Sequence, residues 1–303
     1  MTETEKKGAN AAKKCVFAVI NIANNRNEQR SVAEYAANLA KHLGLEVVLY
    51  VKNDETKFSF EKAYVSVLKL AEDISKISSV RVSTQQKSKF SFFSDIPAIA
   101  AEEHASYIIM QIDESAKFWS ESMWKTTQRS VIPTILLPKN FIFVPFKSIA
   151  IAVDSERKVQ KLNVVIKLAK KFDSTIKVFV ENTIEEEKKP FINIIYNQIC
   201  KNLNGSNIKY ETEPTRKTTK FLTRLCKFSA KHTDLLVIEV EPGKIESDIK
   251  KNLSILLQIL AIEVEPGKIE SDVKNNSQEK AQAKPIPVLL AKTKQYGTVI
   301  TNI

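Results

Sequence analysis

The sequence is poor in the residues that build metal sites, disulfide frameworks and phosphate-binding loops. Its 303 residues include three cysteines, three histidines and six glycines. Cys15, Cys200 and Cys226 are an odd number at wide, irregular spacing, and no CxxC pair occurs. These counts argue against a disulfide framework and a cysteine-based zinc site, and they are typical of a protein in a reducing cytoplasm.

Long hydrophobic runs are also missing. The longest apolar stretch, near residues 253–262, contains Gln258 and is far shorter than the roughly 20 apolar residues that a membrane-spanning helix needs. Residues 1–13 are polar and lack the apolar core of a signal peptide, so we expect a disordered tail there. We therefore expect a cytoplasmic protein without membrane contact.

The charge balance is basic, with 46 lysines and arginines against 35 acidic residues and a formal net charge of +11. The lysines are spread along predicted helices and loops, often beside glutamates, and aromatic residues are not interleaved with them. This distribution favours a solvated lysine-rich surface and ranks a nucleic-acid partner well below it.

The second half of the chain contains the clearest element pattern, a β-α-β crossover. The uninterrupted apolar run at residues 149–153 is typical of a strand buried on both faces of a parallel sheet. Apolar residues then recur at three- and four-residue spacing through residues 162–169, as on one face of a helix. The β-branched and aromatic run at residues 175–180 predicts the next strand. Asp154 and Ser155 lie in the loop after the first strand.

The first half repeats this order. VFAVI at residues 16–20 predicts a strand, Ser31 is the predicted N-cap of the following helix, and residues 46–51 predict a second strand. Asn21 corresponds to Asp154 at an offset of 133 residues. Matched pairs at similar offsets are the predicted helices 60–77 with 193–203 and 95–104 with 218–232, and the predicted strands 80–84 with 208–212 and 104–112 with 232–240. The final apolar strands, 131–139 and 285–292, also match, at the larger offset of 154 residues.

We therefore predict an α/β protein made of two repeated, doubly wound domains, each with a five-stranded, mostly parallel sheet. Domain 1 spans residues 14–142 and domain 2 spans residues 147–303, joined by a segment that contains Pro145. The final strands are apolar edge candidates, and such an edge is prone to aggregation unless it is paired.

One segment breaks the repeat. IEVEPGKIESD occurs at residues 238–248 and again at residues 262–272, a shift of 24 residues, and this accounts for the longer second half. We interpret the segment near residues 238–276 as a tandem duplication in a surface connection, and an added binding or dimerisation element is the alternative. The sequence leaves open which copy lies in the sheet.

Five short, mostly parallel strands with intervening helices, occurring twice, resemble the universal stress protein family. The resemblance is carried by IAIAVD at residues 149–154, HTDLLVIEV at residues 232–240 and PIPVLL at residues 285–290, and it covers nearly the whole chain apart from the tail and the duplicated segment. It implies a doubly wound fold of the adenine nucleotide alpha hydrolase-like type. For many members it also implies ATP binding, through an acidic residue after the first strand and a loop G-x-x-G, nine residues, then G-S/T after the fourth.

The nucleotide-binding residues match this sequence only in part. Asp154 matches the acidic position, the neutral Ser155 lies beside it, and Gly243 lies after the fourth strand of the second half. Glu241, Glu246 and Asp248 lie on either side of Gly243 and would repel a triphosphate unless a cation intervened. The candidate nucleotide-binding residues are therefore Asp154, Ser155 and Gly243.

The first half matches less well, because Asn21 replaces the acid and residues 113–130 contain no glycine. The histidines offer no metal site or catalytic base, since His42, His104 and His232 are far apart in sequence. We interpret His104 and His232 as helix-end residues that complement the helix dipole. No catalytic set and no metal-ligand set is predicted.

We therefore expect a non-enzymatic stress-response or regulatory protein with degenerate nucleotide-binding loops and no cofactor. The alternative is a member that binds ATP or AMP through a divergent loop near Asp154, with slow hydrolysis. The expected partners are the other domain of the same chain, a second copy paired through the final strands, and an unidentified protein.

Overall fold

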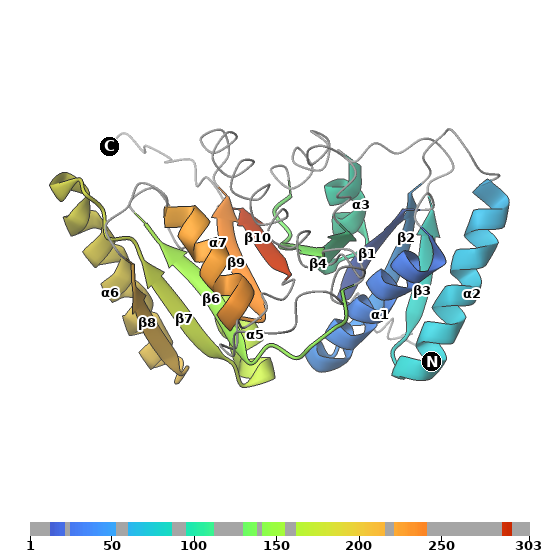
Figure 1. Ribbon diagram of the computed structural model, residues 1–303. Helices are drawn as coiled ribbons and strands as arrows, with labels where there is room; N and C mark the ends of the chain where they lie inside the picture. Colours follow the sequence, from blue (N-terminus) through green and yellow to red (C-terminus); the bar gives the residue numbers. More distant parts are fainter. Residues whose placement is uncertain are drawn as a thin grey trace, which may run out of the picture.

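The computed structural model describes residues 13–21, 25–52, 60–86, 95–111, 130–137, 141–154, 162–215, 221–240 and 287–292. These residues form ten strands and a set of helices that cover both faces of the sheet (Figure 1). The strands are β1 (Cys15–Asn21), β2 (Glu46–Lys52), β3 (Val82–Gln86), β4 (Ala105–Gln111), β5 (Thr134–Leu137), β6 (Ser148–Val153), β7 (Thr175–Val180), β8 (Tyr210–Pro214), β9 (Leu235–Val240) and β10 (Val288–Lys292). The described helices are α1 (Arg26–Leu43), α2 (Phe60–Ser78), α3 (Ile96–Glu102), α5 (Leu162–Phe172), the short 3₁₀ helix η2 (Glu186–Lys188), α6 (Lys189–Gly205) and α7 (Phe221–His232).

All ten strands belong to one sheet, in the order β3-β2-β1-β4-β5-β10-β9-β6-β7-β8. Every neighbouring pair is parallel except β5 and β10, which pair antiparallel with Leu136 opposite Val288. The sequence predicts two five-stranded sheets with the final strands as edge candidates. The structure pairs these two strands with each other at the centre of a single sheet, with β3 and β8 as the outermost strands.

Two apolar cores lie on the two faces of the sheet. One face is covered by α1, α2, α5 and α6, which bury side chains such as Leu39, Ile74, Leu168 and Leu203. The other face is covered by α3 and α7, and it holds the second core. Strand side chains alternate between the two, as expected for a sheet buried on both faces. Each core contains residues from both halves of the chain, so the ten strands form one layer between two helical layers.

Two predicted helix starts are wrong for identifiable reasons. Helix α1 begins at Arg26, because the side chain of Asn25 accepts a hydrogen bond from Glu28 N at 3.0 Å and caps the helix. The predicted cap, Ser31, lies inside α1, and its hydroxyl donates to Phe141 O at 2.8 Å. Helix α6 begins at Lys189, four residues before the prediction, because Pro190 favours the first turn of a helix.

Strands β3 and β8 both begin two residues later than predicted. Val80 and Ile208, the predicted first residues, are buried apolar side chains that belong to the core. Each follows a residue with positive φ, Ser79 at 59° and Asn207 at 55°, so each lies in the turn after a helix. A buried apolar residue in a turn gives the same sequence pattern as the first residue of a strand.

The connection between the halves is an aromatic cluster. The ring of Phe143 lies 5.2 Å from that of Tyr35 on α1. The ring of Phe146 lies 4.7 Å from that of Phe172 on α5. Phe146 is buried, and its carbonyl oxygen accepts a hydrogen bond from Ser174 Oγ. The connection is therefore packed against both halves.

Most residues that adopt the left-handed conformation after a helix in the described part of this protein are not glycines. Gly44 has φ of 67°, and a Cβ added there would meet no atom within 4 Å. Ser79 has φ of 59° at the end of α2, and its side chain is exposed. The left-handed region is unfavourable for residues with a Cβ, and glycine relieves that strain.

We expect Ser79→Gly to raise the free energy of unfolding by about 0.5 kcal/mol, because the relief of backbone strain exceeds the extra entropy of the unfolded chain. The matched change in the opposite direction, Gly44→Ala, should lower it by about 1 kcal/mol. Urea unfolding followed by circular dichroism measures both values. A destabilised Ser79→Gly variant would contradict the interpretation.

The Tyr35 side chain is fully buried, and its hydroxyl has no hydrogen-bond partner among the residues that the structure describes. Burial also raises the pKa of its phenol far above the ordinary value. We expect Tyr35→Phe to raise the free energy of unfolding by about 1 kcal/mol, because the variant buries no unpaired hydroxyl.

Tyr64→Phe is the matched control. The Tyr64 hydroxyl lies 3.1 Å from Thr84 Oγ1, so its removal should lower stability by about 0.5–1 kcal/mol. Thermal unfolding of the two variants should therefore shift in opposite directions, and a loss of stability in both would rule this out.

Candidate functional site

The sheet has two positions at which the helices beside neighbouring parallel strands lie on opposite faces. The first is between β1 and β4, because α1 packs on one face and α3 on the other. The second is between β6 and β9, where α5 and α7 lie on opposite faces in the same way. In open α/β sheets, ligands bind outside the carboxyl ends of the strands at such positions.

Asp154 lies at the second of these positions. It follows the last residue of β6 directly, and Ile149 to Ile151 of that strand pair in register with Leu235 to Val237 of β9. Asp154 is only 5% exposed and already has an interaction within the protein. Ser155 and Gly243 lie outside the described residues. Of the three predicted nucleotide-binding residues, the structure thus describes Asp154 alone.

Two threonines organise the carboxyl ends of the neighbouring strands. Thr215 Oγ1 donates to Val180 O at 2.8 Å and accepts from Asn182 N at 3.1 Å, which connects the end of β8 to the end of β7. Thr183 is buried, and its Oγ1 accepts from Glu185 N at 3.1 Å. The sequence reasoning missed these residues, although a threonine just after a strand is a recognised turn former.

The position between β1 and β4 is less acidic. Asn21 is the last residue of β1, is half-buried and pairs in register with Lys52 of β2. Residues 22–24 and 112–129, which follow β1 and β4, lie outside the described residues. The described part of this position therefore contains an amide where the second half has a carboxylate.

An acidic residue at the opposite edge of the sheet has a structural role. Asp234 Oδ2 accepts hydrogen bonds from Lys147 N at 2.9 Å, from Ser148 N at 3.0 Å and from Ser148 Oγ at 3.2 Å. It thereby fixes the beginning of β6 beside that of β9. This carboxylate is committed to the backbone, and the sequence analysis did not single it out.

The described residues contain no group of three histidine, cysteine, aspartate or glutamate side chains that could hold a metal ion. His232 is the last residue of α7, as predicted, and its ring lies 4.4 Å from that of Phe228. His104 lies two residues beyond the end of α3, in a turn with φ of 55°, and is therefore not part of the helix.

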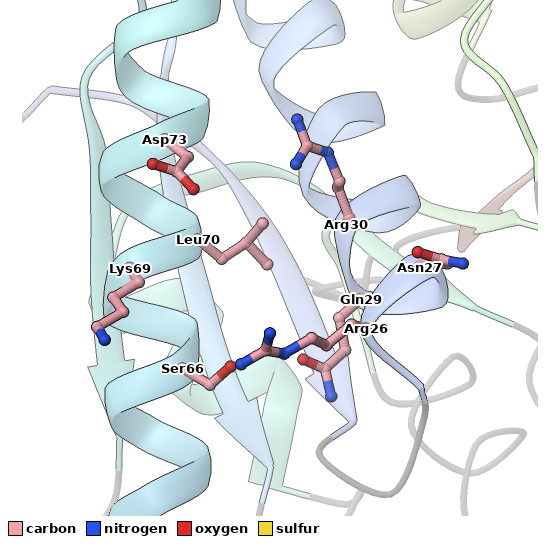
Figure 2. Close-up of a pocket in the computed structure, with 8 residues that line it drawn as sticks. All are labelled: Arg26, Asn27, Gln29, Arg30, Ser66, Lys69, Leu70 and Asp73. Atoms are coloured by element: carbon pink, nitrogen blue, oxygen red, sulfur yellow. The ribbon is translucent and has the colours of Figure 1, made fainter.

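A cavity of about 300 Å³ lies between α1 and α2 (Figure 2). Its lining is polar apart from Leu70 and consists of Arg26, Asn27, Gln29, Arg30, Ser66, Lys69, Leu70 and Asp73. Arg30 Nε donates to Glu34 Oε1 at 2.7 Å, and this contact raises the pKa of the guanidinium. The sequence shows the polar faces of both helices but not that they adjoin, so this cavity was not predicted.

The sequence matches no protein-family model and no curated protein sequence. Solved structures do match over almost the whole chain. A universal stress protein from Archaeoglobus fulgidus has a TM-score of 0.62 at 13% identity, covering 92% of this chain and 97% of its own. A putative universal stress protein from Pseudomonas aeruginosa has a TM-score of 0.59 at 16% identity, covering 93% of this chain and 94% of its own.

The fold is that of the universal stress proteins. The predicted resemblance to this family is thus confirmed at the level of the fold. A third match, a functionally unknown Pseudomonas aeruginosa protein, has a TM-score of 0.57 at 15% identity. In the part of this universal-stress-protein fold that the structure describes, no helix has the length and apolar character needed to cross a membrane.

Cys15, at the start of β1, is a cysteine whose burial lowers the reactivity of its thiol. Its side chain is 2% exposed, and Sγ donates to Glu103 O at 3.2 Å. Burial, together with the charges of Glu103 and Glu46, raises the pKa of this thiol to about 12. The reactive thiolate is therefore nearly absent at neutral pH.

We expect iodoacetamide to modify Cys200 in the folded protein well before Cys15, because Cys200 is half-buried and Cys15 is enclosed. Mass spectrometry of the digested protein separates the two sites. Cys15 should react at an ordinary rate once the protein is unfolded in urea. Native labelling of Cys15 as fast as that of Cys200 would refute the assignment.

Proposed function

We propose that this chain is a non-enzymatic stress-response or regulatory protein whose universal-stress-protein fold has degenerate nucleotide-binding loops. The observation that carries the proposal is the state of Asp154. The resemblance assigns a nucleoside contact to this acid, yet its side chain is 5% exposed and already interacts within the chain. A carboxylate that accepts hydrogen bonds from a ribose must present its oxygen atoms to the ligand.

The glycine content supports the same proposal. A backbone that cradles phosphates needs amide groups that approach closely, and glycines permit this approach. Six glycines occur in 303 residues, and the first one after β9 is Gly243. In the first half, Asn21 offers a single side-chain acceptor oxygen where a carboxylate would offer two.

We further propose that the two halves are repeated domains, at residues 14–142 and 147–303. The order β3-β2-β1-β4-β5 in the first half has the same connectivity as β8-β7-β6-β9-β10 in the second. The structural likeness to the Archaeoglobus protein also extends over both halves. The cysteine pattern supports a cytoplasmic location.

The proposed partner is another protein. Within the described residues, β5 and β10 occupy each other's edges, so a second copy could pair through these strands only after displacing one of them. Exposed large apolar side chains in the described part of the chain offer other contact positions. Two pairs of them, Val65 with Leu68 and Phe191 with Ile194, lie one helical turn apart on α2 and α6.

The alternative is an ATP- or AMP-binding protein that uses a divergent loop near Asp154. Its support is the location of Asp154 outside the carboxyl end of β6, at the position between β6 and β9 where ligands of this class of sheet bind. In this alternative Asp154 turns outward to contact the ribose.

Thermal unfolding with and without ATP and Mg²⁺ distinguishes the proposed non-nucleotide-binding protein from the nucleotide-binding alternative. Under the proposal, ATP at about 1 mM leaves the midpoint unchanged. Under the alternative, a site with a Kd of about 10 μM would gain about 2.7 kcal/mol of stability and a shift of several degrees.

The variant Asp154→Asn tests whether such a shift comes from this residue. Each variant is compared with its own ligand-free midpoint, since a buried acid also affects stability. Asp173→Asn is the matched control, with the same charge change on an exposed residue of the same half. An ATP-dependent shift that Asp154→Asn removes and Asp173→Asn retains would replace the proposal with the alternative.

A further inference from the structure

The cavity between α1 and α2 contains cations that lack counter-ions. Among the residues that the structure describes, Arg26 and Lys69 make no ion pair and no side-chain hydrogen bond. Arg30, the third cation of the lining, is bound to Glu34. Only one carboxylate, that of Asp73, belongs to the lining. The cavity therefore has an excess of positive charge.

The lining groups are arranged in two parts. Figure 2 shows the guanidinium of Arg26 extending from α1 toward Ser66 on α2, with Gln29 beside it. Asp73 and Arg30 lie toward the other end, and the side chain of Leu70 lies between the two parts. The amine of Lys69 points away from α1, so this residue adds charge at the rim.

The spacing of these parts follows from helix geometry. Ser66 and Asp73 are seven residues apart on α2, which corresponds to roughly 10 Å along the helix axis. A guanidinium presents a planar set of donors that matches the oxygen atoms of a phosphate, and a serine hydroxyl can add a further donor. A carboxylate at the other end can accept hydrogen bonds from hydroxyl groups.

We propose that this cavity binds a small phosphorylated sugar, with the phosphate at Arg26 and Ser66 and the sugar hydroxyls toward Asp73. Leu70 contacts the carbon skeleton between the two ends. A volume of about 300 Å³ is at the lower end of the range for small-molecule sites, which suits a ligand of this size. The site lies in the helical layer, and it does not depend on Asp154 or on the proposed function.

The surrounding charges argue for a small ligand instead of a nucleic acid. Glu28 and Glu34 lie on α1, and Glu61 and Glu72 lie on α2, the two helices that carry the basic groups. A phosphate backbone that crossed these helices would meet the four carboxylates together with the cations. A single phosphate group inside the cavity meets the guanidinium of Arg26 without crossing that surface.

The test is isothermal titration calorimetry of the full chain with ribose 5-phosphate, ribose and inorganic phosphate. We expect ribose 5-phosphate to bind with a Kd of about 0.1–1 mM. It should bind more tightly than inorganic phosphate, and ribose alone should not bind measurably. Arg26→Gln should weaken ribose 5-phosphate binding by about 10-fold or more.

Lys41→Gln is the matched control, because it removes one positive charge from an exposed position in the last turn of α1, away from the cavity. It should leave the Kd unchanged. Asp73→Asn should reduce the preference for ribose 5-phosphate over inorganic phosphate.

Three results would overturn the proposal. The first is an absence of ribose 5-phosphate binding at about 10 mM. The second is an equal loss of binding in Arg26→Gln and Lys41→Gln, which would indicate a general charge effect. The third is binding of duplex DNA or of vesicles containing phosphatidic acid that depends on Arg26 while ribose 5-phosphate does not bind.

Discussion

The antiparallel pairing of β5 with β10 is the contact on which the rest of the architecture depends. Each half is a parallel set of strands that would end in a short apolar strand with an unpaired edge, a surface that favours aggregation. The pairing of Leu136 with Val288, and of their neighbours, removes both edges at once. The outermost strands that remain are less apolar. In β8, Glu211 is exposed and pairs with Lys177, and Pro214 ends the strand.

This junction also determines where the helices lie. Equivalent helices of the two halves, α1 with α5 and α2 with α6, cover the same face of the sheet. The facing sides of α1 and α5 leave room for the connecting segment, whose phenylalanines pack against Tyr35 and Phe172. The connection between the halves is thus part of the core and packs against both of them.

Hydrophobic periodicity was sufficient to predict most elements, because strands buried on both faces and amphipathic helices have distinct patterns. Strand β7 coincides with its prediction, and α2 differs by one residue. The predictions fail where contacts between elements, and not the local sequence pattern, determine the structure. Val80 and Ile208 are buried in turns, where a buried apolar residue has the same sequence pattern as the first residue of a strand. In the candidate site, sequence reasoning identified Asp154 but not its burial, and it missed the α1–α2 cavity because that cavity exists only where two helices adjoin.

The scarcity of glycine affects both the helix ends and the two candidate sites. The chain forms left-handed turns with Ser79, His104, Asp173 and Asn207, each of which carries a Cβ. Single turns tolerate this strain, but a phosphate-binding loop needs several backbone amides that converge on one anion. A cavity lined by helical side chains has no such requirement, since Arg26 donates from its own guanidinium. A glycine-poor chain can therefore bind a phosphate group more readily between α1 and α2 than at the carboxyl ends of its strands.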